Sequence, residues 1–207
     1  MPRNLTPLIT GETYHIYNRG TEKRNIFCDK QDYLRFYASL DRFNIEEPVL
    51  SLRDAKRNSD TDIKRLVSIS AYCLLPNHFH LMMTQLLDGG ISEFLKRVTG
   101  GYSGYFNEKN NRSGSLFQGK FKRIHVDSEA YRQYLLVYIN ENHHVHKLDG
   151  VCDIYHTSSV HYQGLKRSNL IQDSHIEKYS TQEAKKLAAD IYQRRNAEKK
   201  LLQVLGE

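Results

Sequence analysis

The sequence predicts an α+β fold: a ferredoxin-like (split βαβ) antiparallel sheet with helices on one face. Residues 12–20, 66–75 and 78–86, and the end of the basic segment 113–127, are rich in β-branched and aromatic side chains, which is typical of strands. The tight turn Pro76-Asn77 joins the two middle segments into a hairpin. Helical spacing of apolar residues follows the first and the third segment. The order strand, helix, strand, strand, helix, strand matches a ferredoxin-like sheet.

The two helices within this unit differ in regularity. Asp29 is a suitable N-cap for a helix over 30–43, whose apolar residues recur at helical spacing. The helix that starts at Ile91 is interrupted by glycines, which weaken it and let another element pack closely. Residues 53–65 are charged and nearly devoid of large apolar side chains, so we expect an exposed loop there.

Two more helices are predicted after the sheet. Ser128 caps a helix over 129–144 that carries Tyr131, Tyr134 and Tyr138 along one side. Thr181 caps a charged helix over 182–205 with only a narrow apolar stripe, which is typical of a solvated or partner-packing element.

Composition restricts the class of protein. The chain has 207 residues and a net charge of +6, which favours a polyanionic partner. The cysteines, Cys28, Cys73 and Cys152, form no CxxC pair, so we expect free thiols and neither a disulfide framework nor a zinc finger. The first residues lack the apolar core of a signal peptide, and no apolar run is long enough for a membrane helix. We therefore expect a cytoplasmic, nucleoid-associated protein without membrane contact.

Two histidines stand one residue apart in the third predicted strand. Residues i and i+2 of a strand point to the same face, so His78 and His80 place their imidazoles side by side, where they could bind a divalent metal. The simpler interpretation is a core histidine beside a solvent-edge histidine. The histidine-triad hydrolases need another histidine where this chain has Met82, so that class is excluded.

Two histidines leave a metal under-coordinated, so a third protein ligand is expected. Tyr138 and Asn142 stand four residues apart and share one helix face, and an amide oxygen suits Mg²⁺ or Mn²⁺. On spacing alone, however, a core tyrosine followed by a frayed helix end is the favoured interpretation.

Four segments together carry a family resemblance. The stretch YCLLPNHFHLMM resembles the HUH signature of single-tyrosine transposases, and GSLFQGKFKRIHV resembles a downstream segment of that family. The stretch YINENHHVHKLDGV is similar to its tyrosine helix, and YHTSSVHY is similar to an aromatic-x-x-Ser-Ser element of the REP-associated tyrosine transposases. The resemblance runs in order from about Tyr14 to Tyr162.

The resemblance implies a site and a domain organisation. It implies His78 and His80 as metal ligands, Tyr138 as nucleophile and Asn142 as third ligand, with Mg²⁺ or Mn²⁺ as the metal. The partner would be single-stranded DNA with a hairpin, cut and rejoined through a 5′-phosphotyrosine intermediate by a monomer or a homodimer. The nuclease domain would span 1–165, with a helical extension over 166–207. His143 replaces the family's proline, so it could alter the helix end or compete for the metal.

Tyrosine chemistry explains why a metal is needed. A tyrosine ester of phosphate conserves the energy of the broken bond for rejoining. Only roughly one phenol in a thousand is ionised at pH 7, so a metal that polarises the phosphate compensates for a weak nucleophile. Tyr134, one turn earlier, is the rival nucleophile, but no amide or carboxylate follows it by four residues.

Basic and aromatic residues near these segments predict DNA contacts. One cluster follows the first strand and the other lies in the Gly-bounded segment, where cations stand beside aromatic rings. The predicted DNA-binding residues are Arg19, Lys23, Arg24, Phe117, Gln118, Lys120, Phe121, Lys122 and Arg123.

Three rival functions remain open at this stage. A replication or transfer initiator would share the chemistry but usually needs more chain. A non-catalytic nucleic-acid-binding module would keep the sheet and the basic loops. A phosphodiesterase that uses water would form no covalent adduct.

Overall fold

The computed structural model describes residues 7–49, 52, 63–145, 153, 156–171, 182 and 186. Its elements follow the predicted order and are β1 (Thr13–Arg19), α1 (Lys30–Arg42), β2 (Val67–Leu75), β3 (His78–Gln85), α2 (Gly90–Lys109) and β4 (Lys122–His125). A 3-10 turn, η1 (Thr21–Lys23), follows β1, and three helices follow β4: α3 (Glu129–Asn140), α4 (Asn142–Val145) and α5 (Ser159–Tyr162).

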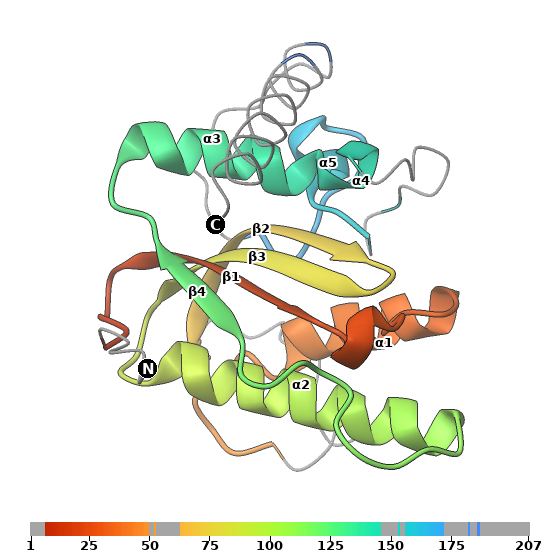
Figure 1. Ribbon diagram of the computed structural model, residues 1–207. Helices are drawn as coiled ribbons and strands as arrows, with labels where there is room; N and C mark the ends of the chain where they lie inside the picture. The colour runs from red at the N-terminus through yellow and green to blue at the C-terminus, as the bar shows by residue number, and fades with distance from the viewer. Residues whose placement is uncertain are drawn as a thin grey trace, which may run out of the picture.

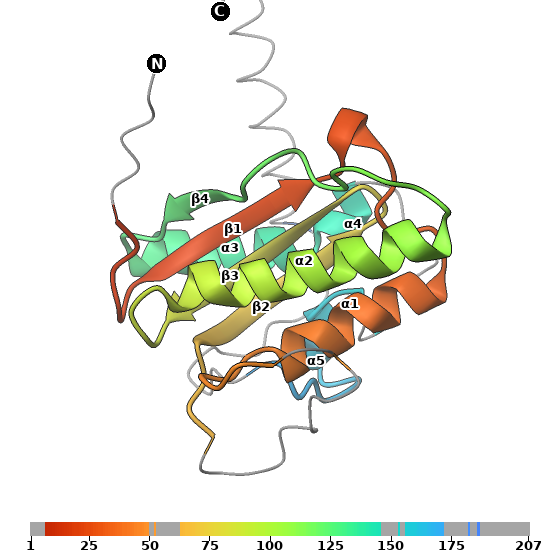
Figure 2. The same ribbon diagram turned by 90° about the horizontal axis from the view of Figure 1, so that it is seen from below.

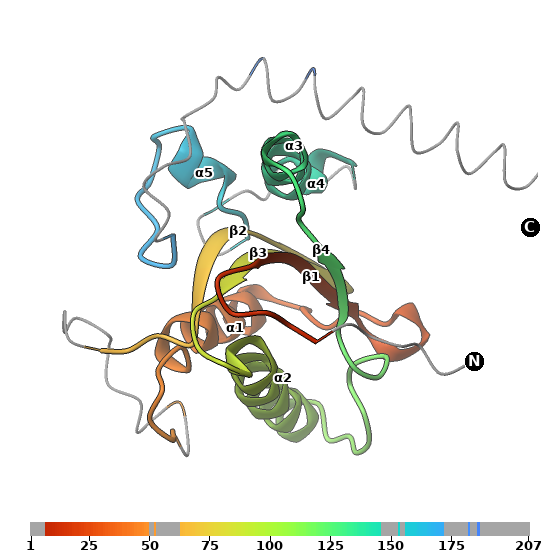
Figure 3. The ribbon, with the colours of Figure 1, turned by 90° about the vertical axis from the view of Figure 1, so that its left-hand side faces the viewer.

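The four strands form one sheet in the order β2-β3-β1-β4, and each of these strands pairs antiparallel with its neighbours. Helices α1 and α2 cover one face, and α3, α4 and α5 lie over the other (Figure 1). The view along the layers in Figure 3 shows the same three-layer arrangement. The predicted ferredoxin-like sheet is confirmed, and the tyrosine-bearing helix lies on the face opposite to α1 and α2.

Side-chain alternation divides the sheet into two cores. On β3, Phe79, Leu81 and Met83 pack in the large core with α1 and α2, whereas Met82 packs in a smaller core with α3. An irregularity in the pairing of β2 between Ile69 and Ala71 shifts this alternation along that strand. The histidines of β3 therefore face α3.

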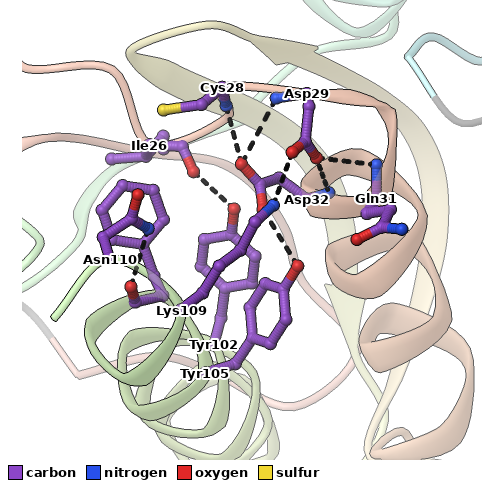
Figure 4. Close-up of polar contacts among 10 residues, drawn as sticks. Ile26, Cys28, Asp29, Gln31, Asp32, Tyr102, Tyr105, Lys109 and Asn110 are labelled. Carbon is purple, nitrogen blue, oxygen red and sulfur yellow. Dashed lines mark hydrogen bonds and ion pairs between the residues drawn. The ribbon is translucent and has the colours of Figure 1, made fainter.

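The pair α1 and α2 lies side by side under the sheet (Figure 2). As predicted, Asp29 caps α1, and it does so in a capping box with Asp32. The buried carboxylate of Asp32 also accepts hydrogen bonds from Tyr105 and from Lys109 Nζ, the latter at 2.7 Å, so it ties the start of α1 to the end of α2 (Figure 4). Gly101 permits close packing, because a Cβ there would lie 3.3 Å from the ring of Phe43.

The described chain after α5 still packs on the sheet. The Ser168 hydroxyl lies 3.2 Å from the hydroxyl of Tyr72, and Leu170 is buried in the large core. The chain as far as Ile171 therefore contacts the sheet, and the boundary between 165 and 166 stays a prediction. The predicted helix over 182–205 and the predicted loop over 53–65 fall almost entirely outside the described residues. None of the described helices has the length and apolar character needed to cross a membrane.

Candidate functional site

A cluster of rings forms where α3 crosses the sheet. The ring of His80 lies 5.1 Å from that of His78 and 5.9 Å from that of Tyr138, between ring centroids. His15 of β1 stacks on His80 at 5.1 Å and meets Tyr138 edge-on at 6.3 Å. The structure thus brings together three predicted site residues, His78, His80 and Tyr138, and adds His15.

The hydrogen bond that each histidine makes through Nδ1 determines whether its Nε2 has a lone pair for a metal. His78 Nδ1 lies 2.6 Å from Asn77 Oδ1, which can only accept, so Nδ1 carries the proton and Nε2 keeps its lone pair in the neutral ring. His80 Nδ1 lies 2.9 Å from His15 Nε2. If Nδ1 of His80 donates this bond, its Nε2 is also a ligand. Two such nitrogens and an amide oxygen are a donor set for a divalent cation.

Tyr138 is half-buried and lies at the end of a ladder of tyrosines on α3. Its ring is nearly parallel to that of Tyr134, with an interplanar angle of 2° and centroids 6.4 Å apart. Tyr131 stacks on Tyr134 at 6.2 Å, and burial raises the pKa of Tyr131. The ring of Tyr138 contacts that of His80, which places the predicted nucleophile beside a predicted metal ligand.

The helix of Tyr138 ends earlier than predicted, at Asn140 instead of 144. The side chain of Ser158 receives a hydrogen bond of 2.9 Å from the Tyr72 amide and donates to Asn140 Oδ1. Thr157 Oγ1 donates to the Asn140 carbonyl at 3.0 Å, which fixes the last turn to the sheet. The short helix α4 then begins at Asn142.

Asn142 is buried at this joint, with 1% of its surface exposed. Its Nδ2 has no hydrogen-bond partner among the residues that the structure describes. This atom is an N–H donor, which a bound cation cannot satisfy, so its lack of a partner says nothing about metal binding through the amide oxygen. The role of Asn142 as third metal ligand stays a prediction.

His143 belongs to a group of its own. Its ligand atom and those of Glu141 and His144 lie within 4.8 Å of one another. Within the described part of the chain this is the one group of three or more His, Cys, Asp or Glu side chains with that spacing, and it does not include His78 or His80.

The two predicted DNA-binding clusters lie next to each other at one end of the sheet. Arg19 pairs with His78 across β1 and β3, and its Nε donates to Gln118 Oε1 at 2.5 Å. The backbone N–H of Gln118 in turn donates to the backbone carbonyl of Arg19 at 2.8 Å. Lys23 lies in η1, and its carbonyl accepts a hydrogen bond from Asn77, the residue before His78. Arg24 forms an exposed ion pair with Glu22.

Strand β4 divides the second cluster between the two faces. Lys122 pairs with Tyr17 and so shares the face of His80, and it is exposed. Arg123 pairs with Ile16 and points to the α2 face. Lys122 and Arg123 therefore lie on opposite faces of the sheet and cannot contact the same DNA surface. Lys120 is exposed in the loop before the strand.

The two aromatic rings of this cluster pack against the core to different extents. Phe117 is only 6% exposed and packs edge-on against Phe79 at 5.9 Å, so its ring belongs to the core. Phe121 is half-buried and packs against the same core. A sequence of alternating basic and aromatic residues gives no sign of which rings the sheet buries.

Sequence reasoning missed three residues that support the site. His15 contacts His80, Ser158 holds the end of α3, and Ser159 Oγ donates to Glu141 Oε1 at 2.8 Å. From the sequence, the Ser-Ser element is identified only through the family resemblance. Its contacts show that it anchors the helix of Tyr138. His15 had a detectable signal, because its position alternates with buried residues in a predicted strand.

The fold has a solved counterpart. A REP-associated tyrosine transposase bound to a REP hairpin superposes with a TM-score of 0.50 at 16% identity, covering 87% of this chain and 100% of that chain. A proposed transposase from Deinococcus radiodurans R1 gives a TM-score of 0.36 at 14% identity over 69% of this chain and 95% of its own, too low to carry an argument. No protein-family model and no curated protein matches the sequence. The predicted resemblance is confirmed at the level of the fold.

Proposed function

We propose that this protein cleaves and rejoins single-stranded DNA as a metal-dependent tyrosine transposase. The observation that carries the proposal is the contact between His80 and Tyr138, whose ring centroids lie 5.9 Å apart. These residues are far apart in the sequence, and the family resemblance implies them as metal ligand and nucleophile. The shared fold with a tyrosine transposase supports the same reading.

The proposed chemistry assigns a step to each residue. The Tyr138 hydroxyl oxygen attacks the phosphorus and loses its proton, and the bond to the 3′ oxygen breaks. A proton on that oxygen completes a free 3′-hydroxyl, while the 5′ phosphate stays on the tyrosine. Attack by another 3′-hydroxyl reverses the step and releases Tyr138. Because the ring of Tyr138 lies against that of His80 of the same chain, we infer that the tyrosine acts in cis.

His78, His80 and Asn142 would hold the cation, Mg²⁺ or Mn²⁺. When bound, the cation supplies charge that polarises the phosphate for in-line attack. Asn77 and His15 orient the two imidazoles through the nitrogens that do not face the ligand. Partial burial restricts the rotation of the Tyr138 ring, whose centroid lies 5.9 Å from that of His80.

The DNA would enter at the end of the sheet where the two basic segments meet. Arg19 stands beside His78, and Lys122 lies on the same face. Both cations can contact phosphates that flank the scissile bond, without reading the sequence of the bases. The hairpin in the related complex belongs to that protein. We propose that this chain also recognises a hairpin in its single-stranded substrate.

A covalent-adduct assay tests the proposal. Wild type, Tyr138→Phe and Tyr134→Phe would be incubated with labelled single-stranded DNA from the flanks of its own gene, with Mn²⁺ or EDTA. Tyr134→Phe is the matched control, because it removes the same hydroxyl one helical turn away. We expect a denaturation-resistant adduct that needs metal, persists in Tyr134→Phe and disappears in Tyr138→Phe. Cleavage without an adduct would indicate a hydrolytic phosphodiesterase, and binding alone would indicate a non-catalytic module.

A further inference from the structure

We propose that Glu141, His143 and His144 form a second cation site, suited to Zn²⁺, at the joint between α3 and α4. Their ligand atoms lie within 4.8 Å of one another, close enough for small side-chain rotations to bring all three onto one ion. Two imidazoles and a carboxylate, with water in the fourth position, are a known donor set for zinc.

The break in the helix is what makes this grouping possible. In an uninterrupted α-helix, residues two apart point about 200° away from each other, so positions 141 and 143 could not share an ion. Glu141 lies between the two helices with φ −96° and ψ 6° and is part of neither. The chain turns at this residue, and its side chain and that of His143 converge.

Hydrogen bonds outside the group orient its ligands. Glu141 Oε1 accepts from Ser159 Oγ at 2.8 Å, and Gln163 Nε2 donates to that hydroxyl at 2.7 Å. His143 Nδ1 lies 2.9 Å from the Asn140 carbonyl, which only accepts. Nδ1 therefore carries the proton, and Nε2 of the neutral ring keeps its lone pair for a metal. Such outer contacts accompany most metal-binding histidines and carboxylates.

Charge also favours an ion here. Glu141 is fully buried, and a buried carboxylate needs compensation by positive charge. His144 Nε2, 3.1 Å from Glu141 Oε2, carries positive charge only when protonated, whereas a divalent cation would add charge beside this carboxylate with both imidazoles neutral. Of the three ligands, His143 lines a cavity of about 250 Å³ together with Leu75 and Pro76.

A bound ion would fix the joint that carries Asn142. This residue lies between the ligands Glu141 and His143, directly after the helix of Tyr138. The second site is therefore structural in role: it sets the backbone from which Asn142 projects and takes no part in the chemistry at phosphorus.

Metal binding by the full chain tests this inference without relying on DNA cleavage. The protein would carry His78→Ala and His80→Ala, which remove the proposed catalytic ligands. Zn²⁺ binding would be measured by calorimetry, and Co²⁺ would report the ligand geometry by its visible absorption. We expect one equivalent of Zn²⁺ with a tetrahedral Co²⁺ spectrum, and at least about a tenfold loss of affinity on adding His144→Ala.

The controls separate this site from ordinary pairs and from misfolding. His125→Ala removes the histidine of another His–Glu pair, at 2.8 Å from Glu12, and should leave the affinity unchanged. Because His144 pairs with the buried Glu141 carboxylate, its replacement should also lower the thermal stability of the metal-free protein, so Zn²⁺ affinities are compared only between variants that are folded. A folded double variant that binds no Zn²⁺, or binding that His144→Ala and Glu141→Gln leave intact, would overturn the inference. Neither result depends on whether the protein is a transposase.

Discussion

Replacing His15 by phenylalanine should weaken metal binding at His80 while the fold persists. A metal on His80 Nε2 requires the proton on Nδ1, which then donates to His15 Nε2 at 2.9 Å. Phenylalanine keeps a ring but offers no acceptor. In the metal-free protein the His80 proton can move to Nε2, whereas in the metal-bound protein it cannot. Loss of this hydrogen bond therefore destabilises the metal-bound protein more than the metal-free protein, and it is measured as a weaker affinity for the metal.

The structure sets the size of this effect. Both rings are buried, at 6% and 7% exposure, so water does not readily replace the lost acceptor. A buried donor without its acceptor costs about 1–3 kcal/mol, which corresponds to roughly 5- to 150-fold in the dissociation constant. At other metal sites, loss of a residue that hydrogen-bonds a ligand weakens metal affinity by about 10- to 100-fold, which is in the same range.

Mn²⁺ titration followed by electron paramagnetic resonance measures this affinity directly. His15→Gln supplies an oxygen acceptor near the position of Nε2 and should recover most of the affinity. Tyr17→Phe is a matched control, because Tyr17 also stacks on His80, at 5.7 Å, and keeps its ring. Equal Mn²⁺ affinity in wild type and a folded His15→Phe protein would refute the assigned role of His15.

Three further predictions concern stability and DNA binding. Lys109→Met leaves the buried carboxylate of Asp32 without its cation at 2.7 Å, so it should lower the free energy of unfolding, measured in urea, by about 2 kcal/mol. Lys96→Met, at an exposed ion pair, is the control and should change that free energy by less than about 0.5 kcal/mol. Burial lowers the pKa of His156 from 6.5 to about 4, so the unfolded chain takes up the proton first. In urea titrations the free energy of unfolding should be highest above pH 6.5 and fall by up to about 3 kcal/mol toward pH 4. His156→Phe should flatten this pH dependence. If the variant shows the same pH dependence as wild type, the burial argument is contradicted. Lys122→Ala should weaken single-stranded DNA binding and reduce its salt dependence by about one ion, measured by fluorescence anisotropy with Lys96→Ala as control; an identical salt slope would exclude a phosphate contact.

Local patterns were sufficient to predict most of the fold. Asp29 and Ser128 cap the helices that the sequence assigned to them, because capping depends on a few neighbouring residues. The two-residue period placed His78 and His80 on one face, because alternation is a property of any strand. These signals are local, so a single sequence contains them.

The same local rules failed where distant segments decide the outcome. Phe117 has the sequence neighbours of a DNA-binding ring, yet contact with Phe79 places it in the core. The spacing of residues 129–144 predicted one helix, but contacts from Thr157 and Ser158 end it at Asn140. Pairing of β1 with β3 brought His15 onto His80, and no periodicity records which strands become neighbours.

The sequence by itself therefore determined the order of elements, the histidine face and the choice of Tyr138 as candidate nucleophile. Only the tertiary structure decided that Tyr138 and His15 contact His80. It also decided that contacts from the distant Thr157 and Ser158 end α3, beyond which Glu141, His143 and His144 converge. The physical reason is range. Caps and periodicity act over a few residues, whereas a site is assembled by packing between elements that are far apart along the chain.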